Sequence, residues 1–401
     1  MENKIDKVES NKEKDFLNLS RLNLSPHYIE DFLKFYRKNL FKKKKQKEKI
    51  SYDLAKISEA GIIIQIIKDA FKNYPFNEML DLDTIKGFIE SDKNHVFVFR
   101  NDKNNIIGTI TFVLDFEAKK GYIRSFAVLR RYWGKLDITN ATRSVYSHMY
   151  ESYKDTIFIW YSETLTVSAK AQHIFKQCYV EPIGFFPNKD ILCNKVESEI
   201  LQVAYNRKVI TQYRSKEVPR IIIEVMKAFV YSSLKYNLIS VNIEEPNIKL
   251  ALKKIQEIYQ KFQIKEIKDK FGYIEVKMSF NNSKSELSFI YTPQQRNIIN
   301  MNYKVSFLEE LSVFLKKISF IIKEKEIRYC ECYVSAYKPS HQRLFSHHGF
   351  KPRGYIPSWK YNKEKDVFED YILFNIFYGE IQKDFQRIEE IDLVMNHFFE
   401  K

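Results

Sequence analysis

The sequence predicts an α+β (mixed α/β) fold built from two copies of one domain. Three observations support this prediction: one phrase occurs twice, strand-like and helical segments are interspersed, and 401 residues suffice for two or three domains. Hydrophobic residues make up 44% of the chain, with 32 Phe and 26 Tyr, which favours packed, β-containing structure. We therefore expect two tandem domains, each large enough to bury a core.

The repeated phrase begins with Gln-x-x-Phe and ends with Pro-x-Gly-x-x-Pro. It spans residues 172–187 and recurs at residues 342–357 without a gap, an offset of 170 (342 − 172). Five residues are identical in the two copies, although the whole chain has only ten Gly and ten Pro. Solenoid repeats have periods of about 20–50 residues, so this spacing indicates a duplicated globular domain.

Hydrophobic periodicity predicts the elements of the first copy in order. A strand at 52–57 is followed by helices at 60–74 and 83–90. A hairpin and a third strand then occupy 95–100, 106–114 and 122–129. A helix at 140–153, a strand at 156–161 and a helix at 169–177 lead to the repeated phrase. The predicted order is βααβββαβα and a final hairpin.

We expect three parts along the chain. Residues 1–50 form an N-terminal extension, with disorder to about residue 15, a helix over about 26–45 and a Lys-rich run at Lys42–Lys45. Such a run is typical of a solvated helix end or linker. Residues 51–215 form the first domain, and residues 216–401 form the second, with a C-terminal helix.

The formal net charge of +15 indicates a field that attracts polyanions. A phosphate-rich cofactor, RNA or an acidic carrier protein would explain it, and so would lysines that only solvate the surface. No stretch approaches the roughly 18 apolar residues of a membrane span, and the polar N-terminus lacks a signal core. We expect a cytoplasmic protein whose four cysteines are reduced, because they form no CxxC pair. The oligomeric state is left open.

The element order and two motifs resemble the GNAT superfamily of N-acetyltransferases. Strand Ser125–Val128 followed by Arg131–Lys135 is similar to the superfamily's pyrophosphate motif, Gln/Arg-x-x-Gly-x-Gly/Ala, at a helix entrance. The helix ending in Gly349-Phe350 is similar to its closing pattern, where the first copy has Tyr179-Val180. The resemblance covers about residues 51–205 and the last third of 218–378. It implies two GNAT-like domains, each a mixed, mostly antiparallel sheet flanked by helices.

The resemblance implies acetyl-CoA or another acyl-CoA as cosubstrate. A helix N-terminus suits a diphosphate because it offers unsatisfied N–H groups and a partial positive charge, and glycine permits close approach. Leu136 stands where the family has Gly or Ala, so Gly134 in an ordinary turn capped by Asp137 is the alternative. The expected cofactor-binding residues are Phe126, Ala127, Val128, Arg130, Arg131, Gly134 and Lys135.

The second copy is expected to be degenerate. No glycine occurs from Tyr273 to His348, the interval that would contain its pyrophosphate arm, and the equivalent position is Asn297–Val305. We expect this domain to pack on the first and wall the acceptor cleft. A new binding surface is the alternative.

Direct attack of an amine, the superfamily's mechanism, requires a base for the ammonium and an acid for the departing thiolate. We predict Glu163, at a strand end, as the base, with Asp115 and Glu117 as alternatives. Phe175 replaces the family's common Tyr acid, which leaves Tyr179 or His173 as candidates; a core aromatic and a surface residue are their structural alternatives. No metal is expected, because the His341, His347 and His348 group lacks a carboxylate or Cys at matching spacing.

The sequence therefore favours an acyl-CoA-dependent N-acyltransferase that acts on an amine of a small molecule or peptide. A tRNA-dependent aminoacyl transferase of similar tandem fold is one alternative, favoured by the positive charge. A non-catalytic binding protein that retains the fold is the other, favoured by Phe175 and Phe345.

Overall fold

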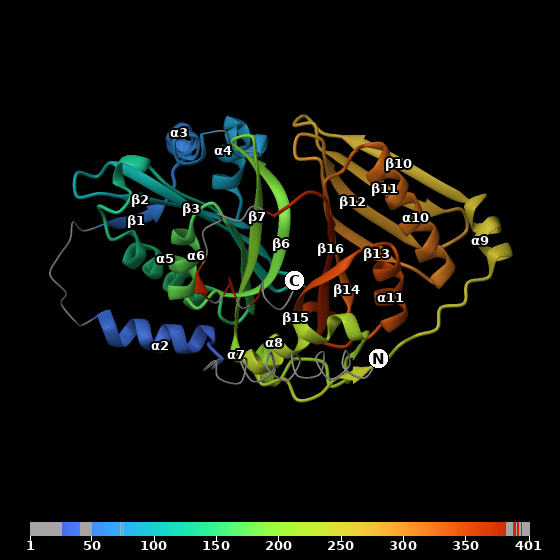
Figure 1. Ribbon diagram of the computed structural model, residues 1–401. Helices are drawn as coiled ribbons and strands as arrows, with labels where there is room; N and C mark the ends of the chain where they lie inside the picture. Colours follow the sequence, from blue (N-terminus) through green and yellow to red (C-terminus); the bar gives the residue numbers. More distant parts are fainter. Residues whose placement is uncertain are drawn as a thin grey trace, which may run out of the picture.

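The computed structural model describes residues 26–40, 50–72, 74, 76–381, 388–389, 391–392 and 394. One sheet of 14 strands runs through this part of the chain, and helices pack against its faces (Figure 1). Its strand order is β1-β2-β3-β4-β5-β7-β6-β15-β16-β14-β13-β12-β11-β10. Neighbouring strands in it are antiparallel except for β4–β5 and β13–β14, which confirms the predicted mixed, mostly antiparallel sheet flanked by helices.

The first half of the molecule, as the term is used below, contains strands β1 to β7. Its strands are β1 (Ser51–Leu54), β2 (Asn94–Arg100), β3 (Ile106–Asp115), β4 (Lys120–Val128), β5 (Ile159–Leu165), β6 (Glu181–Leu192) and β7 (Lys195–Tyr205). Its helices are α2 (Ile29–Leu40), α3 (Ala60–Phe71), α4 (Leu82–Glu90), α5 (Ile138–Ser152), α6 (Ala169–Gln177) and α7 (Arg207–Thr211). The predicted run 1–15 and the Lys-rich run lie outside the described residues.

The second half contains strands β10 to β16. These are β10 (Phe262–Lys268), β11 (Ile274–Phe280), β12 (Glu286–Thr292), β13 (Asn297–Lys304), β14 (Tyr329–Ser335), β15 (Lys351–Asn362) and β16 (Val367–Phe377). Its helices are α8 (Met226–Tyr236), α9 (Leu252–Tyr259), α10 (Leu308–Glu324) and α11 (Pro339–His347), and β8 (Arg220–Ile221) pairs with β9 (Asn242–Ile243). Most of the predicted C-terminal helix lies outside the described residues.

The predicted element order of the first half agrees with the structure, but several boundaries differ by one to four residues, and β5 continues to Leu165, so Glu163 lies within this strand and not at its end. The strand predicted at 156–161 begins at Ile159, because the amides of Thr156 and Ile157 donate to the Tyr153 carbonyl and close the preceding helix. The helix predicted from residue 140 begins at Ile138, because the Asp137 carboxylate caps it. Both shifts follow from local hydrogen bonds that periodicity does not report.

The repeated phrase makes the same contacts in both halves. The amide of Gln172 donates to the Leu165 carbonyl at 3.1 Å, and that of Gln342 donates to the Ser335 carbonyl at 3.0 Å, again an offset of 170. Each buried Gln thus ties a helix to the strand before it. The phrase is therefore a structural device that anchors α6 on β5 and α11 on β14.

The two halves join where the glycines of the phrase meet. Gly184 of β6 pairs with Gly354 of β15 in an antiparallel arrangement at the centre of the sheet. A Cβ atom at position 354 would lie 2.9 Å from the Ile183 carbonyl oxygen and 3.0 Å from the Gly184 Cα. Only glycine permits this backbone approach. One hydrophobic core crosses the junction, with Phe185 and Leu201 packed in the same cluster as Tyr355 and Leu373.

We expect Gly354→Ala to destabilise the protein by about 1–3 kcal/mol, because the added Cβ would meet backbone atoms that cannot move without separating β6 from β15. Urea unfolding followed by circular dichroism measures the change. Gly87→Ala in α4 is the control, since that position has open space and the helix propensity of Ala is higher. Equal stabilities for Gly354→Ala and the wild type would contradict a close junction.

Candidate active site

Strands β4 and β5 diverge and open a cavity between them. They pair in parallel only over Lys120–Tyr122 and Ile159–Tyr161. Beyond this point β4 carries a bulge, where Ser125 has φ 54° and the register with β3 shifts. Beyond Tyr122, β4 does not pair with β5, and the Val128 carbonyl at the end of β4 accepts from the Trp133 indole at 2.7 Å.

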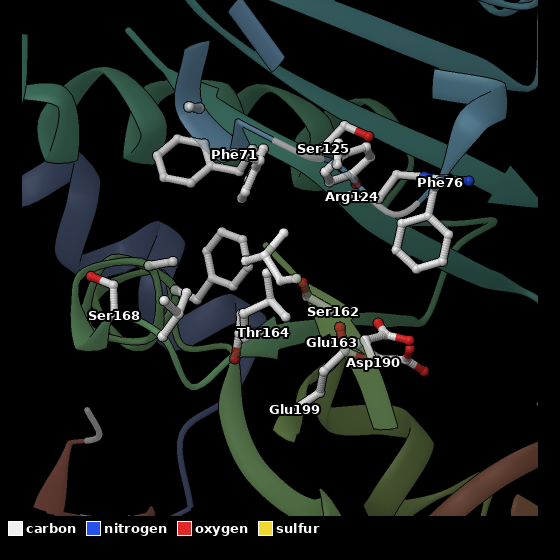
Figure 2. Close-up of a pocket in the computed structure, with 18 of the residues that line it drawn as sticks. Phe71, Phe76, Arg124, Ser125, Ser162, Glu163, Thr164, Ser168, Asp190 and Glu199 are labelled. Carbon is white, nitrogen blue, oxygen red and sulfur yellow. The ribbon is translucent and has the colours of Figure 1, made fainter. Parts of the chain in front are cut away.

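The cavity has a volume of about 910 Å³ and lies between the two halves. Figure 2 shows Phe71 and Ser125 on one side of it and Ser162, Thr164 and Glu163 on the other. The second half supplies the rest of the wall, with Phe271, Tyr273, Ile290, Ile299, Asn300 and Glu331 among its lining residues. Tyr273 donates to Glu78 at 2.5 Å, which fastens this wall to the first half.

One end of the cavity is cationic. It is formed by the loop of residues 129–137 between β4 and α5, called the Gly134 loop below, and by the start of α6. Arg130 and Lys170 each lie 5.5 Å from the centre of the Trp133 ring. Gly134 has φ +73°, and a Cβ atom there would find no atom within 4 Å. The loop thus leaves open space beside two cations.

The predicted cofactor-binding residues separate into two groups. Phe126, Val128, Arg130 and Gly134 line the cavity. Ala127 points to the opposite face of the sheet, into the core under α3, because side chains alternate along a strand. Arg131 and Lys135 are exposed and do not line the cavity.

The N-terminus of α5 already has an anionic cap. The Asp137 carboxylate accepts a hydrogen bond from the Asn140 amide at 3.3 Å. Asp137 therefore caps α5, as the alternative prediction from the sequence stated. The open Gly134 loop is present in addition to this cap. A diphosphate at this loop would lie beside the Asp137 charge, so Arg130 and Lys170 must supply the compensating positive charge.

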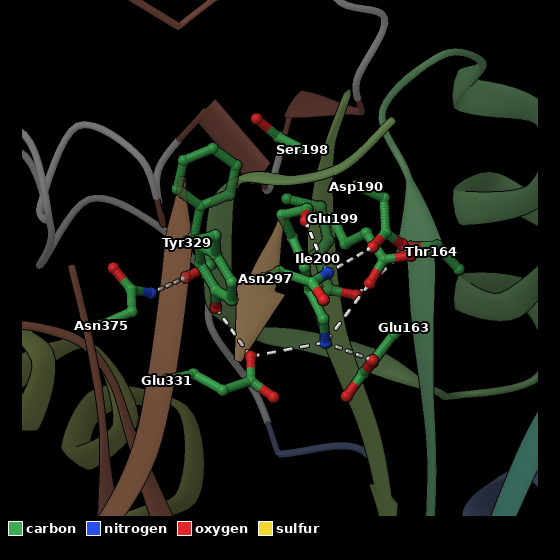
Figure 3. Close-up of polar contacts among 12 residues, drawn as sticks. Glu163, Thr164, Asp190, Ser198, Glu199, Ile200, Asn297, Tyr329, Glu331 and Asn375 are labelled. Carbon is green, nitrogen blue, oxygen red and sulfur yellow. Dashed lines mark hydrogen bonds and ion pairs between the residues drawn. The ribbon is translucent and has the colours of Figure 1, made fainter. Parts of the chain in front are cut away.

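The other end of the cavity is acidic. Glu163, Asp190, Glu199 and Glu331 lie together (Figure 3), and three of these carboxylates are ion-paired with the Lys189 ammonium. We call the four carboxylates and Lys189 the acidic cluster. Lys189 Nζ lies 2.6 Å from Glu163 Oε2, 3.4 Å from Glu331 Oε2 and 3.5 Å from Glu199 Oε2. The fourth carboxylate, Asp190, accepts from the Asn297 amide at 3.0 Å. The cluster therefore combines strands β5, β6 and β7 with β14 of the second half.

Burial and mutual repulsion control protonation in this cluster. Burial raises the pKa of Asp190, raises that of Glu199 well above its usual range, and raises that of Glu331 to about 7. Burial opposes the charge on Lys189, but Glu163, Glu331 and Glu199 outweigh it and raise the Lys189 pKa well above its usual value. The cluster thus contains a firmly charged ammonium and carboxyls that hold protons near neutral pH.

Residues from the second half hold Lys189 in place. Its carbonyl accepts from the Asn297 amide at 2.9 Å and from the Arg328 guanidinium at 3.0 Å. The β6–β7 register shifts between Phe186 and Asp190, and Asn188 within this irregularity has φ 54°. The bulge and the two donors together direct the Lys189 side chain into the cluster.

The three predicted catalytic residues lie in different places. Glu163 lines the cavity with its side chain 19% exposed. Tyr179 packs instead on α2, with its ring 4.8 Å from His27 and 5.8 Å from Phe32, and His173 is exposed on α6. Neither of these two lines the cavity, and the runners-up Asp115 and Glu117 are also exposed and outside it. The structure therefore brings only Glu163 to the site.

Sequence reasoning missed Lys189, Asp190, Glu199 and Glu331. A weak signal was available, because Glu331 interrupts the apolar strand of Tyr329–Ser335 and Lys189 follows a buried apolar run. An ionisable residue that is buried in a strand needs a partner. The partners here are far apart in sequence, so the signal could not identify the cluster.

The second half has no counterpart of the Gly134 loop within its described residues. Only residues 305–307 separate β13 from α10. The first amides near this helix are occupied, because Ser306 and Phe307 both donate to Glu310 Oε2, at 3.2 Å and 3.1 Å. Tyr303 packs between His341 and Phe345 beside β13. These contacts leave no open phosphate-binding loop at the start of α10.

With this geometry in view, comparison with known proteins is informative. A model of the acetyltransferase (GNAT) family matches residues 63–135, which run from α3 through the bulged strand β4 to the Gly134 loop. The first half contains a GNAT acetyltransferase domain. No curated protein matches. The matched residues, 63–135, include every residue that the sequence predicted to bind the cofactor.

Solved structures with similarity to the chain include two acetyltransferases of Vibrio species. The ribosomal-protein-S5-alanine acetyltransferase from Vibrio fischeri is 14% identical, with 41% of this chain and 96% of that chain covered and a TM-score of 0.34. The spermidine N-acetyltransferase from Vibrio cholerae in complex with CoA and spermine is 11% identical, with 40% and 96% covered and a TM-score of 0.34.

Three further features concern the described residues. His, Cys, Asp and Glu side chains form no group of three or more with the arrangement of a metal site. Every helix in this part of the chain is too short or too polar to cross a membrane. All four cysteines are free thiols, and Cys193 lines the cavity.

Proposed function

We propose that this protein is an acyl-CoA-dependent N-acyltransferase that acetylates an amine of a small molecule or peptide. The observation that carries the proposal is the cavity of the GNAT domain, which is cationic at the Gly134 loop and acidic around Lys189. A cosubstrate rich in phosphate suits the first end, and an ammonium suits the second. Both ends open into one space, as transfer between two bound molecules requires.

The cosubstrate would bind along β4. Its phosphates would lie at the Gly134 loop near Arg130 and Lys170, and its extended amide chain would pair with β4 beyond Tyr122. The bulge at Ser125 lies between the two ends of the cavity. This order places the thioester next to Glu163 and β5, which is consistent with attack by an amine bound at the acidic end.

Glu163 is the candidate base. It would take a proton from the acceptor ammonium; the nitrogen lone pair then forms the C–N bond, the C–S bond breaks, CoA leaves as a thiolate, and the nitrogen gives up its second proton to that thiolate or to solvent. Thiols have a pKa of about 8.5, so the thiolate is a tolerable leaving group at neutral pH. The reaction therefore does not require a general acid at the position that Phe175 occupies.

We further infer that residues 51–215 and 216–401 are copies of one GNAT-like domain, with residues 1–50 as an extension. Support comes from the matching order of strands outward from the junction and from the equal contacts of Gln172 and Gln342. The second copy would serve as a wall of the acceptor site. RNA and an acidic carrier protein gain no support, because the acceptor end is itself acidic; the same charge disfavours the tRNA alternative.

Acetyl-CoA should raise the thermal midpoint of the protein, because a ligand that binds only the folded state stabilises it. Calorimetric titration should give about one CoA per chain, since the second half lacks an open phosphate-binding loop. An unchanged thermal midpoint at saturating acetyl-CoA would favour the alternative that the protein is a non-catalytic binding protein. A stoichiometry of two would show that the second half also binds the cosubstrate.

A further inference from the structure

We propose that the second half takes part in the chemistry through Glu331, which acts with Lys189 as a pair of positioning residues for the base Glu163. In this arrangement the proton of the acceptor ammonium enters a cluster of carboxylates and not an isolated glutamate. The inference rests on the proposed acyl transfer and extends it to the half of the molecule that lacks a cosubstrate site.

Lys189 contacts one partly exposed carboxylate and two buried carboxylates. Its ammonium is closest to Glu163, at 2.6 Å, and is also within 3.5 Å of Glu331 and Glu199. Glu163 is the most exposed of these carboxylates, at 19%, whereas the side chains of Glu331 and Glu199 are 4% and 8% exposed. An acceptor in the cavity therefore reaches Glu163, and the other two carboxylates lie behind Lys189.

A hydrogen bond from Tyr329 fixes the position of the Glu331 carboxylate. The Tyr329 hydroxyl donates to Glu331 Oε2 at 2.7 Å, and this is the oxygen that faces Lys189. The Lys189 backbone is fixed by Asn297 and Arg328, as described above. Three contacts from the second half thus determine where the ammonium lies relative to Glu163.

The cluster eases the proton transfer in a specific way. Before the reaction, Glu163 is ion-paired with Lys189 at 2.6 Å. When Glu163 receives the proton, Lys189 keeps the Glu331 and Glu199 oxygens within 3.5 Å, so the buried ammonium still has polar partners. Glu331 therefore helps to hold the ammonium in place while Glu163 changes its charge.

Several other titratable groups surround Glu163. Burial keeps the tyrosines among them neutral at physiological pH, because it raises their pKa values. The buried carboxyls are therefore the groups around Glu163 that can change charge near neutral pH. The groups that face Glu163 from β4, β5, β6, β7 and β14 are Tyr122, Tyr161, Lys189, Asp190, Glu199, Tyr329, Glu331 and Tyr333.

The test is the pH dependence of kcat/KM for acetyl-CoA and a primary amine, measured on the full chain. Glu331→Gln should remove the change of kcat/KM with pH near 7, because it removes the carboxyl whose pKa burial raises to about 7. Lys189→Met should lower kcat/KM across the profile, because Glu163 loses the ammonium that lies 2.6 Å from it. A role of Glu331 that is limited to stability predicts an unchanged profile in Glu331→Gln.

Glu369→Gln is the matched control. This glutamate of β16 accepts from the Asn362 amide at 2.9 Å and does not line the cavity. Its profile should equal that of the wild type. An unchanged profile near pH 7 in Glu331→Gln would overturn the inference even if Lys189→Met does not fold.

An infrared titration separates this inference from the proposed function. The C=O band of protonated carboxyls should show a group in the wild type that titrates near neutral pH and is lost in Glu331→Gln, whether or not acetyl-CoA binds. Absence of that band would refute the cluster. Presence of the band without any acetyl-CoA binding would instead refute the acyl transfer, and with it the positioning role of Glu331.

Discussion

Replacing Lys189 with Met is expected to lower the free energy of unfolding by about 3–5 kcal/mol at about pH 8. The substitution leaves four carboxyls around a neutral side chain, and the closest of them, Glu163, loses a partner at 2.6 Å. Buried charges without a counterion are the most costly arrangement in a protein interior. Urea unfolding at several pH values measures the effect.

The loss should shrink as the pH falls. Burial raises the pKa of Glu199 and Glu331 above the unfolded values, so the folded state binds protons more tightly than the unfolded state does. The penalty is absent below the unfolded pKa of about 4.3 and grows as pH rises through the folded values. Lys277→Met, at an exposed lysine, is the control and should be neutral at every pH. A pH-independent loss in Lys189→Met would indicate poor packing as its cause.

Gly134→Asp is expected to abolish stabilisation by acetyl-CoA. The new carboxylate would project into the open space beside Arg130 and Lys170, where it would compete with phosphate for both cations. Loss of two charge-assisted hydrogen bonds, at roughly 1.5–3 kcal/mol each, would weaken binding on the order of a hundredfold or more. The thermal midpoint with and without acetyl-CoA measures the outcome.

Gly134→Asn is the matched variant for this experiment. Asn has nearly the same size as Asp and tolerates a positive φ better than most residues, so it tests the backbone strain at φ +73° without the charge. We expect it to retain most of the acetyl-CoA shift. If both variants lose the shift equally, the steric requirement at this position outweighs the electrostatic one.

Features encoded locally in the sequence were predictable. The apolar face of α3, with Ile63, Ile66 and Ile67 buried, and the alternation along β4 follow directly from periodicity. The repeated phrase indicated equivalent elements because Gln172 and Gln342 need the same buried carbonyl partners. The Gly134 loop could be found because a glycine beside cations at a helix entrance has a recognisable chemistry.

The acidic cluster could not be predicted for physical reasons. Lys189 reaches it only because β6 is irregular between Phe186 and Asp190, and because Asn297 and Arg328, over 100 residues away, hold its carbonyl. Tyr179 was a candidate acid by its position near Phe175. In the structure it takes the left-handed backbone conformation, φ 61°, at the place where the second half has Gly349, and its ring turns to α2.

The meeting of Gly184 and Gly354 has a consequence for how this molecule assembles. In a separated half, β6 or β15 would be an outer strand with unpaired backbone groups, which invite association with other chains. In the intact protein each such strand finds its partner on the same polypeptide, so the pair behaves as a tethered dimer. Dilution cannot separate tethered partners, because their effective concentration is fixed by the connecting chain. An active site shared between the halves therefore remains complete at any protein concentration.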